Sequence, residues 1–479
     1  MSSYAPLPVV AIIGGGFTGA AVAVHLAERG QAGVAARIVV FEPREKLGAG
    51  LAYDTNEAAN RINVPAERMS LYPDDPESFI RWVEENDALK DDPDAFAADG
   101  LPFPRRHVFG DYAYAQVAPH LSTGRIEHRR TEVTGLRRSN GRWRVSGADG
   151  ADLEADHVVL AVSHPAPAAP RVLATLASHP RFIPDATVAG AVDGIRPDDR
   201  VLIVGNGLTS ADVVAALANR GHKGRIVSIS RRGLRSRGHP AVAQEAFGDF
   251  ISEPSRTASH LLARIRRTLR EAAALGLTWH PVLDAVRGQG QEIWKALPIS
   301  ERRRLARHAR AYWDVHRFRI APQVERVLDD AIAAGRLEIL AASLAYATRS
   351  GDDIHVGIKL RDGGIDREIE ADAVVVTTGP AHGGILHSQP FLSQLEEQGY
   401  LSLCTTGLGL SCDRQSRALG ASGEVAPDLL IAGPLARGTF GELMGLPQVA
   451  EHAEAVAGEL AEALGRQAAD GQAKRGVAG

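Results

Sequence analysis

The sequence predicts an α/β fold with two parallel, doubly wound sheets and a helical insertion. Residues 8–30 and 199–221 each combine a short apolar strand, a glycine-rich turn and an apolar helix that ends at glycine. A second strand follows each unit, at residues 37–42 and 225–230. Because such strand–helix–strand units form parallel sheets, we expect two Rossmann-like domains in this chain of 479 residues.

The first glycine-rich turn has the spacing of a dinucleotide-binding site. Gly14, Gly16 and Gly19 lie between a predicted strand and a predicted helix. They allow a tight turn, a close approach of the backbone to a pyrophosphate, and close packing of the helix on the strand. Glu42 ends the next strand, where a carboxylate binds ribose hydroxyls. The other cofactor-binding residues predicted here are Phe17, Thr18 and Pro43.

The second turn has the same arrangement, with Ser210 in place of the third glycine. Arg231 and Arg232 follow its second strand, where the first unit has a carboxylate. Guanidinium groups match the oxygens of the 2′-phosphate of NADP, so we expect NADPH rather than NADH. A solvated basic turn is the alternative interpretation. The predicted contacts to this coenzyme are Gly205, Gly207, Leu208, Thr209, Ser210, Arg231 and Arg232.

Two dinucleotide sites in one chain predict hydride transfer, because a flavin accepts hydride from a nicotinamide held opposite it. We expect the first site to hold FAD, enclosed by N-terminal and C-terminal segments together. A late strand ends at Gly433, and a helix begins near Pro447 and Gln448. The N-terminus of that helix would stabilise reduced, anionic flavin at its N1–O2 edge.

Two loop-like stretches, residues 48–53 and 61–70, are expected over the isoalloxazine and adenine ends of the cofactor. Loops on a rigid scaffold often form binding sites, although a surface excursion without ligand is the alternative. Their predicted cofactor contacts are Gly50, Tyr53, Asn63 and Met69.

Composition divides the chain into nested segments. We expect an FAD-binding domain over residues 1–165 and 379–466, and an NAD(P)H-binding domain over residues 166–240 and 337–378. Residues 241–336 are predicted to be a helical insertion, within which the stretch 256–319 has 14 Arg or Lys and five Asp or Glu. Residues 467–479, rich in Gly, Ala and Gln, are predicted to be a flexible tail.

Composition also excludes several classes of protein. Two cysteines cannot build a disulfide scaffold or a Cys-rich metal site, and we predict no metal. No apolar stretch reaches the ~18 residues of a membrane span, and glycines interrupt the N-terminal apolar run, so we expect a cytoplasmic protein. The net charge of −4 argues against nucleic acid as a partner, although the basic insertion keeps that alternative open. A homo-oligomer is compatible with the sequence.

Taken together, the motifs resemble the FAD/NAD(P)-binding oxidoreductases of the YdhS-like group, over roughly residues 8–460. The most specific segment is Trp313-Asp-Val-His316-Arg317-x-Arg319. Residues 48–53, 63–70, 103–112, 230–233 and 433–438 add to the resemblance. The group looks related to flavin-dependent N-hydroxylating monooxygenases and to an FAD-dependent urate hydroxylase. Two segments depart from its pattern, the AVSHP turn at 161–165 and the start of the last helix at 445–450.

The resemblance implies an oxidoreductase in which NADPH reduces FAD. A flavin C4a-(hydro)peroxide formed with O2 would then hydroxylate a small polar substrate, such as an amino acid, another amine or an electron-rich heterocycle. Such chemistry needs few acid–base groups, because the protein mainly excludes water and positions the substrate. The candidate catalytic residues are Arg68, Ser70, His239 and Arg317. The alternatives are an NADPH-dependent flavin reductase or oxidase without oxygen insertion, and a non-catalytic FAD-binding redox partner.

Overall fold

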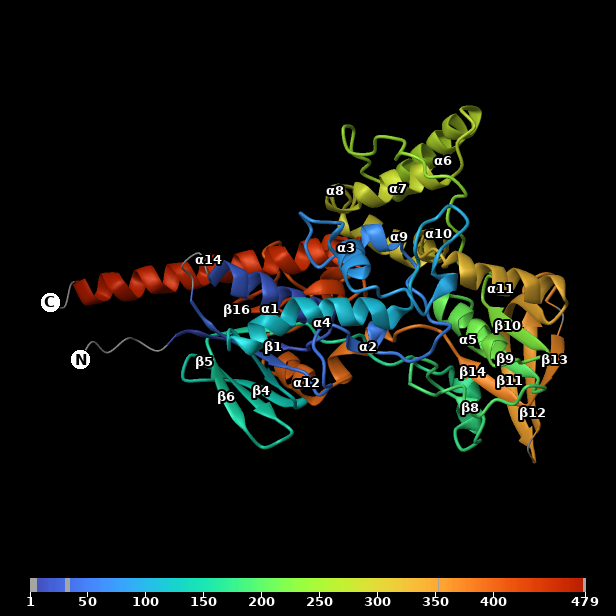
Figure 1. Cartoon of the computed structure of the whole chain (residues 1–479), viewed down its shortest axis with the longest axis horizontal. Coiled ribbons are helices and arrows are strands. Elements are labelled where there is room, and N and C mark those ends of the chain that lie inside the picture. Colours follow the sequence, from blue (N-terminus) through green and yellow to red (C-terminus); the bar gives the residue numbers. More distant parts are fainter. Residues whose placement is uncertain (1–6, 31–34, 352, 365, 477–479) are drawn as a thin grey trace.

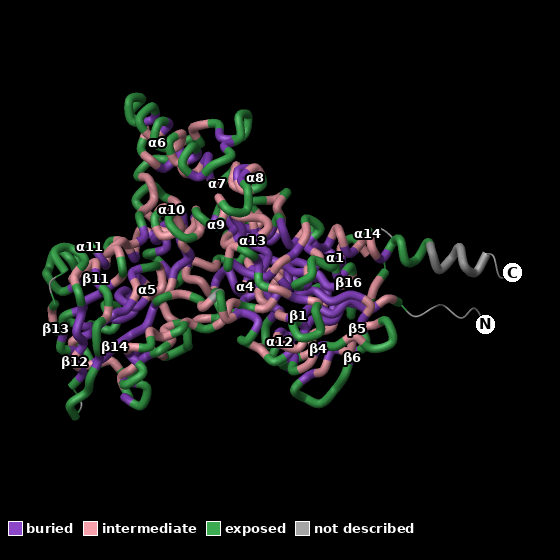
Figure 2. Tube along the Cα trace, turned by 180° about the vertical axis from the view of Figure 1, so that it is seen from behind, coloured by how far each residue is buried: buried purple, intermediate pink, exposed green. Residues whose placement is uncertain are grey.

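The computed structural model describes residues 7–30, 35–351, 353–364 and 366–476. Two α/β units lie side by side, and an arm made of α6 (Ala258–Ala274), α7 (His280–Gly288) and α8 (Gly290–Ala296) projects between them (Figure 1). Buried residues run along both sheets, whereas α6 is largely exposed (Figure 2). The observed architecture is therefore the mixed α/β fold with two parallel-strand sheets that the sequence predicts.

The first sheet carries the first glycine-rich turn. Its order is β15-β16-β7-β1-β2-β3. The parallel strands are β1 (Val9–Ile13), β2 (Arg37–Phe41), β3 (Ile126–Arg129), β7 (His157–Leu160) and β16 (Val425–Ile431), with β15 (Arg417–Leu419) antiparallel at the edge. Every residue of β1 is buried, as expected for a central parallel strand covered on both faces.

N-terminal and C-terminal segments build this first domain together. Strand β16 pairs with β7, and α1 (Phe17–Gly30) packs against both α4 (Arg106–Ser122) and the last helix, α14 (Gln448–Gly476). A small antiparallel sheet of β4 (Val133–Ser139), β5 (Arg142–Gly147) and β6 (Asp152–Ala155) is covered by α12 (Pro390–Glu397). The domain is therefore discontinuous in sequence.

The second sheet has the order β13-β12-β11-β10-β9-β14-β8. Its parallel strands are β8 (Phe182–Ile183), β9 (Val201–Val204), β10 (Ile226–Ser230), β11 (Leu337–Ser350) and β14 (Ala373–Val376). Strands β12 (Asp353–Leu360) and β13 (Asp366–Ala371) extend it as an antiparallel hairpin. Helix α5 (Leu208–Asn219) begins directly after the second glycine-rich turn.

The helical insertion also contains α9 (Ile299–His308) and α10 (Arg310–Arg317), and it has a small core of its own around Phe250 and Val282. Helix α11 (Pro322–Ala333) lies within the range 241–336 predicted for the insertion, but it packs on α5 and leads into β11. It supplies the helix that a crossover between the parallel strands β10 and β11 requires. The insertion proper therefore ends before Pro322.

The last helix is longer than the sequence analysis expects. Helix α14 continues to Gly476, so residues 467–476, predicted to be a flexible tail, are helical, and residues 477–479 lie outside the described part of the chain. The remaining short elements are α2 (Gly50–Tyr53), η1 (Ala66–Arg68), α3 (Ser78–Glu85), η2 (Pro93–Ala95), η3 (Arg171–Leu176), η4 (His382–His387), η5 (Gly433–Ala436) and α13 (Arg437–Phe440).

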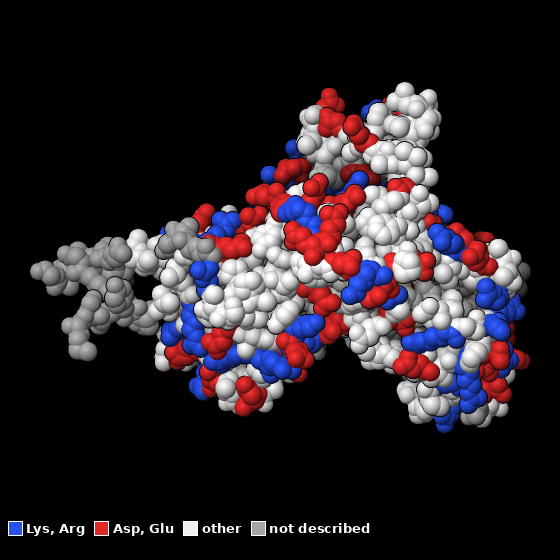
Figure 3. Space-filling view, viewed as in Figure 1, with Lys and Arg blue, Asp and Glu red and all other residues white. Residues whose placement is uncertain are grey.

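One face of the molecule gathers acidic side chains. Figure 3 shows Asp and Glu concentrated around α3, below the arm. The acids on α3 and the turn before it are Asp74, Asp75, Glu77, Glu84 and Glu85. Charge is therefore unevenly distributed, since this acidic face neighbours a basic insertion although the net charge is only −4.

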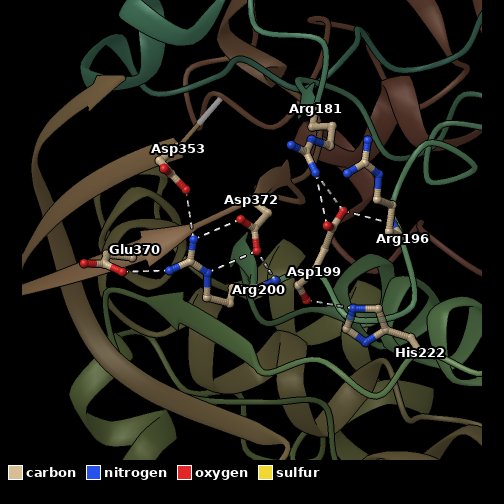
Figure 4. A network of polar contacts seen from close by, with 8 residues as sticks. All are labelled: Arg181, Arg196, Asp199, Arg200, His222, Asp353, Glu370 and Asp372. Atoms are coloured by element: carbon tan, nitrogen blue, oxygen red, sulfur yellow. Dashed lines mark hydrogen bonds and ion pairs between the residues drawn. The ribbon is translucent and has the colours of Figure 1, made fainter. Parts of the chain in front are cut away.

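A network of charged side chains connects strands of the second sheet near the amino end of β9 (Figure 4). Arg200, which precedes β9, forms ion pairs with Asp353 at 3.1 Å, Glu370 at 2.7 Å and Asp372 at 2.9 Å. The hydrogen bond from Arg200 holds the pKa of Asp372 below its usual range. This network attaches the β12–β13 hairpin to the sheet. It lies at the amino end of β9, whereas Gly205 follows the carboxyl end, so the network is not part of the nucleotide site.

Candidate functional site

The first glycine-rich turn lies at the carboxyl end of β1 and leads into α1. Gly14 has φ +98°, and a Cβ there would lie 2.6 Å from the carbonyl oxygen of Ala161. A Cβ on Gly19 would overlap the carbonyl oxygen of Gly14. The glycines therefore let α1 lie directly on the turn. The backbone N–H groups and the positive end of α1 at this edge form a cradle for a pyrophosphate.

Glu42 is held beside this turn, just beyond the end of β2. Its buried carboxylate accepts hydrogen bonds from the backbone N–H groups of Gly15 at 3.0 Å and Arg44 at 3.1 Å. The guanidinium of Arg44 donates to the same carboxylate at 3.0 Å, whereas Pro43 is exposed. A carboxylate fixed at this place is the group that a ribose diol requires.

The C-terminal segment reaches the same edge. Gly433 has φ +66°, and a Cβ there would lie 2.6 Å from Oγ1 of Thr18 on α1. The N–H of Gly433 donates to Nδ1 of His452 at 3.0 Å, and Nε2 of His452 donates to Oγ of Ser416 at 3.0 Å. Burial lowers the pKa of His452 to about 4, so the ring is neutral and holds Gly433 in place.

The segment 48–53, predicted to be a loop, packs on the turn itself and contains the short helix α2 over its last four residues. The N–H of Gly48 donates to the carbonyl oxygen of Gly15 at 2.8 Å, and a Cβ on Gly50 would lie 2.8 Å from Cα of Gly16. Tyr53 follows, with its ring 4.7 Å from that of Phe109. The structure therefore brings the sequence-predicted Gly16 and Gly50 together, and the ring of Phe17 also contacts Phe109, at 5.5 Å.

The loop over residues 61–70 divides into buried and exposed parts. Met69 and Ser70 are buried, and Oγ of Ser70 accepts a hydrogen bond from the N–H of Tyr72 at 2.9 Å. Arg68 is exposed on η1. The carbonyl oxygen of Asn63 accepts a hydrogen bond from Nε2 of His239 at 3.0 Å. These contacts give Ser70 a role in the loop's own structure, and its catalytic role stays a prediction.

The second turn repeats the local geometry at the carboxyl end of β9. Gly205 has φ +125°, and a Cβ there would overlap the carbonyl oxygen of Thr377. Gly207 is the N-cap of α5, which begins at Leu208 and Thr209. Beneath the turn, Oγ of Ser228 donates to Oδ1 of Asn206 at 2.5 Å and lies 3.2 Å from Oγ of Ser210. The polar side chains below the turn thus form hydrogen bonds with one another, and the backbone N–H groups at the N-terminus of α5 remain available to a phosphate.

The arginine pair lies beside this second turn, after β10. Arg231 is exposed, and Arg232 is half-buried with its guanidinium carbon 4.5 Å from the centre of the Tyr312 ring. Tyr312 belongs to α10, so the helical insertion forms one wall next to the pair. A cation held over an aromatic face is pre-positioned for a phosphate.

Several contacts join the two α/β units. The crossings between the domains pair through a β-bridge between Pro167 and Pro380. Arg106 on α4 donates to Asp212 on α5 at 2.8 Å, and burial raises the pKa of that carboxyl although Arg106 opposes the shift. Burial lowers the pKa of His239 to about 4, so its ring is neutral when Nε2 donates the hydrogen bond to the carbonyl oxygen of Asn63.

Buried charges join the insertion to the segment that precedes α14. Nε of Arg317 donates to Oε1 of Glu442 at 2.5 Å, and both side chains are 5% exposed. Arg287 on α7 donates to the carbonyl oxygen of Leu446 at 2.7 Å and to Oε1 of Gln448 at 3.1 Å. Arg317, a predicted catalytic residue, is therefore placed near the start of α14, where Pro447 and Gln448 were predicted to meet the flavin.

The sequence analysis gives no individual role to several residues of this junction, although Trp313 and Arg437 lie in segments that carry the resemblance. Arg437 is buried and lies 3.8 Å from Asp314, and Nε1 of Trp313 donates to Glu442 at 3.2 Å. Arg437 and Glu442 are the only charged residues between positions 429 and 450. Isolated charges in an apolar, glycine-rich stretch are the signal that could have identified them, because such groups are buried only when paired.

Other chemistries have little support in the described part of the chain. No group of three or more His, Cys, Asp or Glu side chains there could hold a metal ion. Both cysteines are buried and free, and burial raises the pKa of Cys412 to about 12. None of the described helices combines the length and the apolar character that crossing a membrane demands.

Known proteins share parts of this sequence and this fold. The family of FAD-NAD(P)-binding domains matches residues 11–165, and curated protein sequences give no significant match. The reduced form of ornithine hydroxylase from Pseudomonas aeruginosa has a TM-score of 0.64 at 18% identity, covering 96% of this chain and 99% of that chain. Ornithine N-hydroxylase from Kutzneria sp. 744, with reduced FAD, NADP+ and L-ornithine, has a TM-score of 0.59 at 17% identity, covering 97% and 100%.

Bacillithiol disulfide reductase from Staphylococcus aureus is also similar, with a TM-score of 0.54 at 13% identity, covering 95% of this chain and 99% of that chain. Likeness over nearly the whole length confirms the predicted fold, whereas membership of the YdhS-like group stays a prediction. Residues 11–165 therefore match the FAD-NAD(P)-binding family, and the chain as a whole shares the fold of these two-dinucleotide-binding flavoproteins.

Proposed function

We propose that this protein is an FAD-dependent, NADPH-using monooxygenase that hydroxylates the amine of a small polar molecule. The observation that carries the proposal is the pair of glycine cradles, each at the carboxyl end of a parallel sheet, on either side of crossings that pair at Pro167 and Pro380. Two similar structures are ornithine hydroxylases, which supports an amine as the reacting group.

The residues present fit these cofactors. Gly14, Gly16 and the N-terminus of α1 would hold the FAD pyrophosphate, and Glu42 would hold the ribose. Arg231 and Arg232 would hold the 2′-phosphate of NADPH. Bound FAD supplies hydride acceptance and the activation of O2.

The protein's own contribution at the flavin is positional. Arg287 bonds to Leu446 and Gln448, so it orients the first turn of α14, whose positive end favours negative charge on the flavin. Neutral His452 holds Gly433 against Thr18 on the other side. These contacts fix the segments on both sides of the proposed flavin site, and none of them forms an acid–base dyad. That agrees with a reaction in which the protein positions substrate and excludes water.

Anaerobic reduction of the FAD-loaded protein tests the proposal. NADPH should bleach the flavin faster than NADH does, and air with a panel of primary amines, ornithine included, should then give a hydroxylated product by mass spectrometry. Full peroxide release with every amine would instead favour a flavin oxidase. A flavin that neither NADPH nor NADH reduces would favour the non-catalytic redox partner.

A second candidate is a disulfide reductase, since one similar structure has that activity. The two thiols argue against it. Cys412 has its pKa raised by burial, and thiolate is the nucleophile in thiol–disulfide exchange. Cys404→Ala/Cys412→Ala is therefore expected to retain NADPH oxidation within about twofold, because buried thiols of this kind act as small apolar groups. If wild type, without oxygen, reoxidises its reduced flavin with an added small disulfide and the double variant does not, stopped-flow absorbance would instead support the disulfide reductase.

Gly16 gives a test of the FAD cradle that separates binding from folding. A Cβ at Gly16 would lie 3.4 Å from Cα of Gly50, a contact the protein tolerates, but it would occupy the approach of the pyrophosphate. Gly16→Ala should therefore weaken FAD binding at least about tenfold and leave the Tm of the FAD-free protein unchanged. Gly458→Ala, with open space around its Cβ, is the control. Equal FAD affinity of the two variants by fluorescence titration would refute the cradle.

A further inference from the structure

A basic cavity lies where the insertion meets the C-terminal part of the first domain. Its volume is about 600 Å³, and it is lined by α9, by the start of α10 and by residues 405–408. Arg303, Arg304, Arg307, His308 and Arg310 line it, together with Thr406. None of the described residues that line it is Asp or Glu. Its size suits a small molecule rather than a single ion.

Part of the positive charge in this cavity has no acidic partner. Arg303 and Arg307 have the i, i+4 spacing that places two side chains on one face of α9, and Arg310 is the first residue of α10. Among the described residues, Arg303 and Arg307 have no acidic partner. Arg304 and Arg310 do have one, since Nη1 of Arg304 lies 3.9 Å from Oε1 of Glu301 and Nε of Arg310 lies 3.2 Å from Oδ2 of Asp314. Like charges at i, i+4 destabilise a helix, and α9 has no buried residue that would offset this effect. A bound anion removes the repulsion.

The cavity adjoins the segment expected to meet the flavin. Asp314, the partner of Arg310, also lies 3.8 Å from Arg437, four residues after Gly433. On the opposite wall, the N–H of Leu408 donates to Sγ of Cys404 at 3.2 Å. Leu410, two residues on, donates its N–H to the carbonyl oxygen of Leu435 at 2.8 Å. Both walls of the cavity thus rest on residues 433–438.

We propose that this cavity binds the anionic part of the substrate, and that the substrate is a small molecule with two or more carboxylate or phosphate groups. The inference rests on the proposed function and specifies its substrate class. Guanidinium forks on α9 would bind the anionic groups, and the rest of the molecule would extend past Arg310 toward the flavin.

Calorimetric titration of the FAD-loaded protein with inorganic pyrophosphate and, separately, with citrate tests the proposal. The variant is Arg303→Gln/Arg307→Gln on α9. The control is Arg266→Gln/Arg270→Gln on α6, which removes two exposed arginines at the same i, i+4 spacing in the same insertion. We expect the α9 variant to bind the better of the two anions at least about tenfold more weakly than wild type, and the α6 variant to bind it unchanged. A preference for one anion tells phosphate from carboxylate.

The flavin spectrum, recorded during the same titrations, tests the position of the cavity. An anion that binds beside the flavin should perturb its visible absorption, in wild type and in the α6 variant. Equal affinity of both variants, no binding to wild type at millimolar anion, or binding without a spectral change would each overturn the proposal. Single-stranded RNA binding that both variants lose equally would also overturn it in favour of a general basic surface.

The outcome is distinguishable from a failure of the proposed function. If NADPH does not reduce the flavin, the monooxygenase assignment fails by itself, and the substrate role of the cavity fails with it. Calorimetry with the α9 and α6 variants would still report whether the cavity binds anions. If NADPH reduces the flavin normally and the α9 variant binds both anions like wild type, only the anionic substrate is refuted.

Discussion

Replacing Arg231 and Arg232 together with alanine is expected to raise the KM for NADPH about a hundredfold and to leave the KM for NADH almost unchanged. Each guanidinium would donate charge-assisted hydrogen bonds to the 2′-phosphate, and the loss of one such contact weakens binding about tenfold. NADH has a hydroxyl at this position, so it loses little. The position of Arg232 over Tyr312 supports the expectation, because the guanidinium is already held in place.

Steady-state oxidation of both coenzymes by wild type and variant measures this effect. Arg130→Ala/Arg137→Ala removes two exposed arginines from the first domain and serves as the control for net charge. A general loss of positive charge would change both proteins alike. If the Arg231/Arg232 variant shows the same increase in KM for NADPH and NADH, the pair does not bind the 2′-phosphate, and the basic turn is simply solvated.

The second large effect is expected at the buried ion pair between Arg317 and Glu442. Glu442→Gln should lower the free energy of unfolding by about 3–5 kcal/mol, because it leaves the Arg317 guanidinium buried without a counter-charge. The two side chains are 5% exposed, and Nη2 of Arg317 already has no hydrogen-bond partner in the described part of the protein. Flavin retention should fall with stability, since Glu442 lies between Gly433 and Gln448, the two positions proposed to lie beside the flavin.

Urea unfolding and FAD retention of three variants test this expectation. Arg317→Met/Glu442→Gln should recover most of the lost stability, because the uncompensated charge is gone. Glu127, whose side chain is 39% exposed, pairs with Arg37 and Arg129, and Glu127→Gln should change the stability by less than about 1 kcal/mol because water screens these pairs. If Glu442→Gln is no more harmful than Glu127→Gln, the buried pair does not hold the insertion on the flavin-side segment.

Much of the fold follows from local patterns. The spacing of Gly14, Gly16 and Gly19 predicts both the turn and the helix after it, because Gly19 packs on the backbone of Gly14 and Gly14 packs against Ala161 at the end of the adjacent strand. Glu42 is placed by the end of its own strand, and Gly205 repeats the pattern in the second sheet. The same local reasoning places α11 in the insertion. It fails there, because only the pairing of β10 with β11 shows that α11 is a crossover helix.

The sequence by itself determined the two dinucleotide turns, the parallel sheets and the discontinuous order of segments, since periodicity and glycine spacing act over a few residues. Only the tertiary structure decided which charges meet at the flavin-side junction. Arg317 and Glu442 are 125 residues apart, and Arg287 and Gln448 are 161 apart. The basic cavity likewise combines α9 with the loop at 405–408. No spacing rule reaches such distances, because these contacts depend on how the insertion packs against the completed domain rather than on neighbours along the chain.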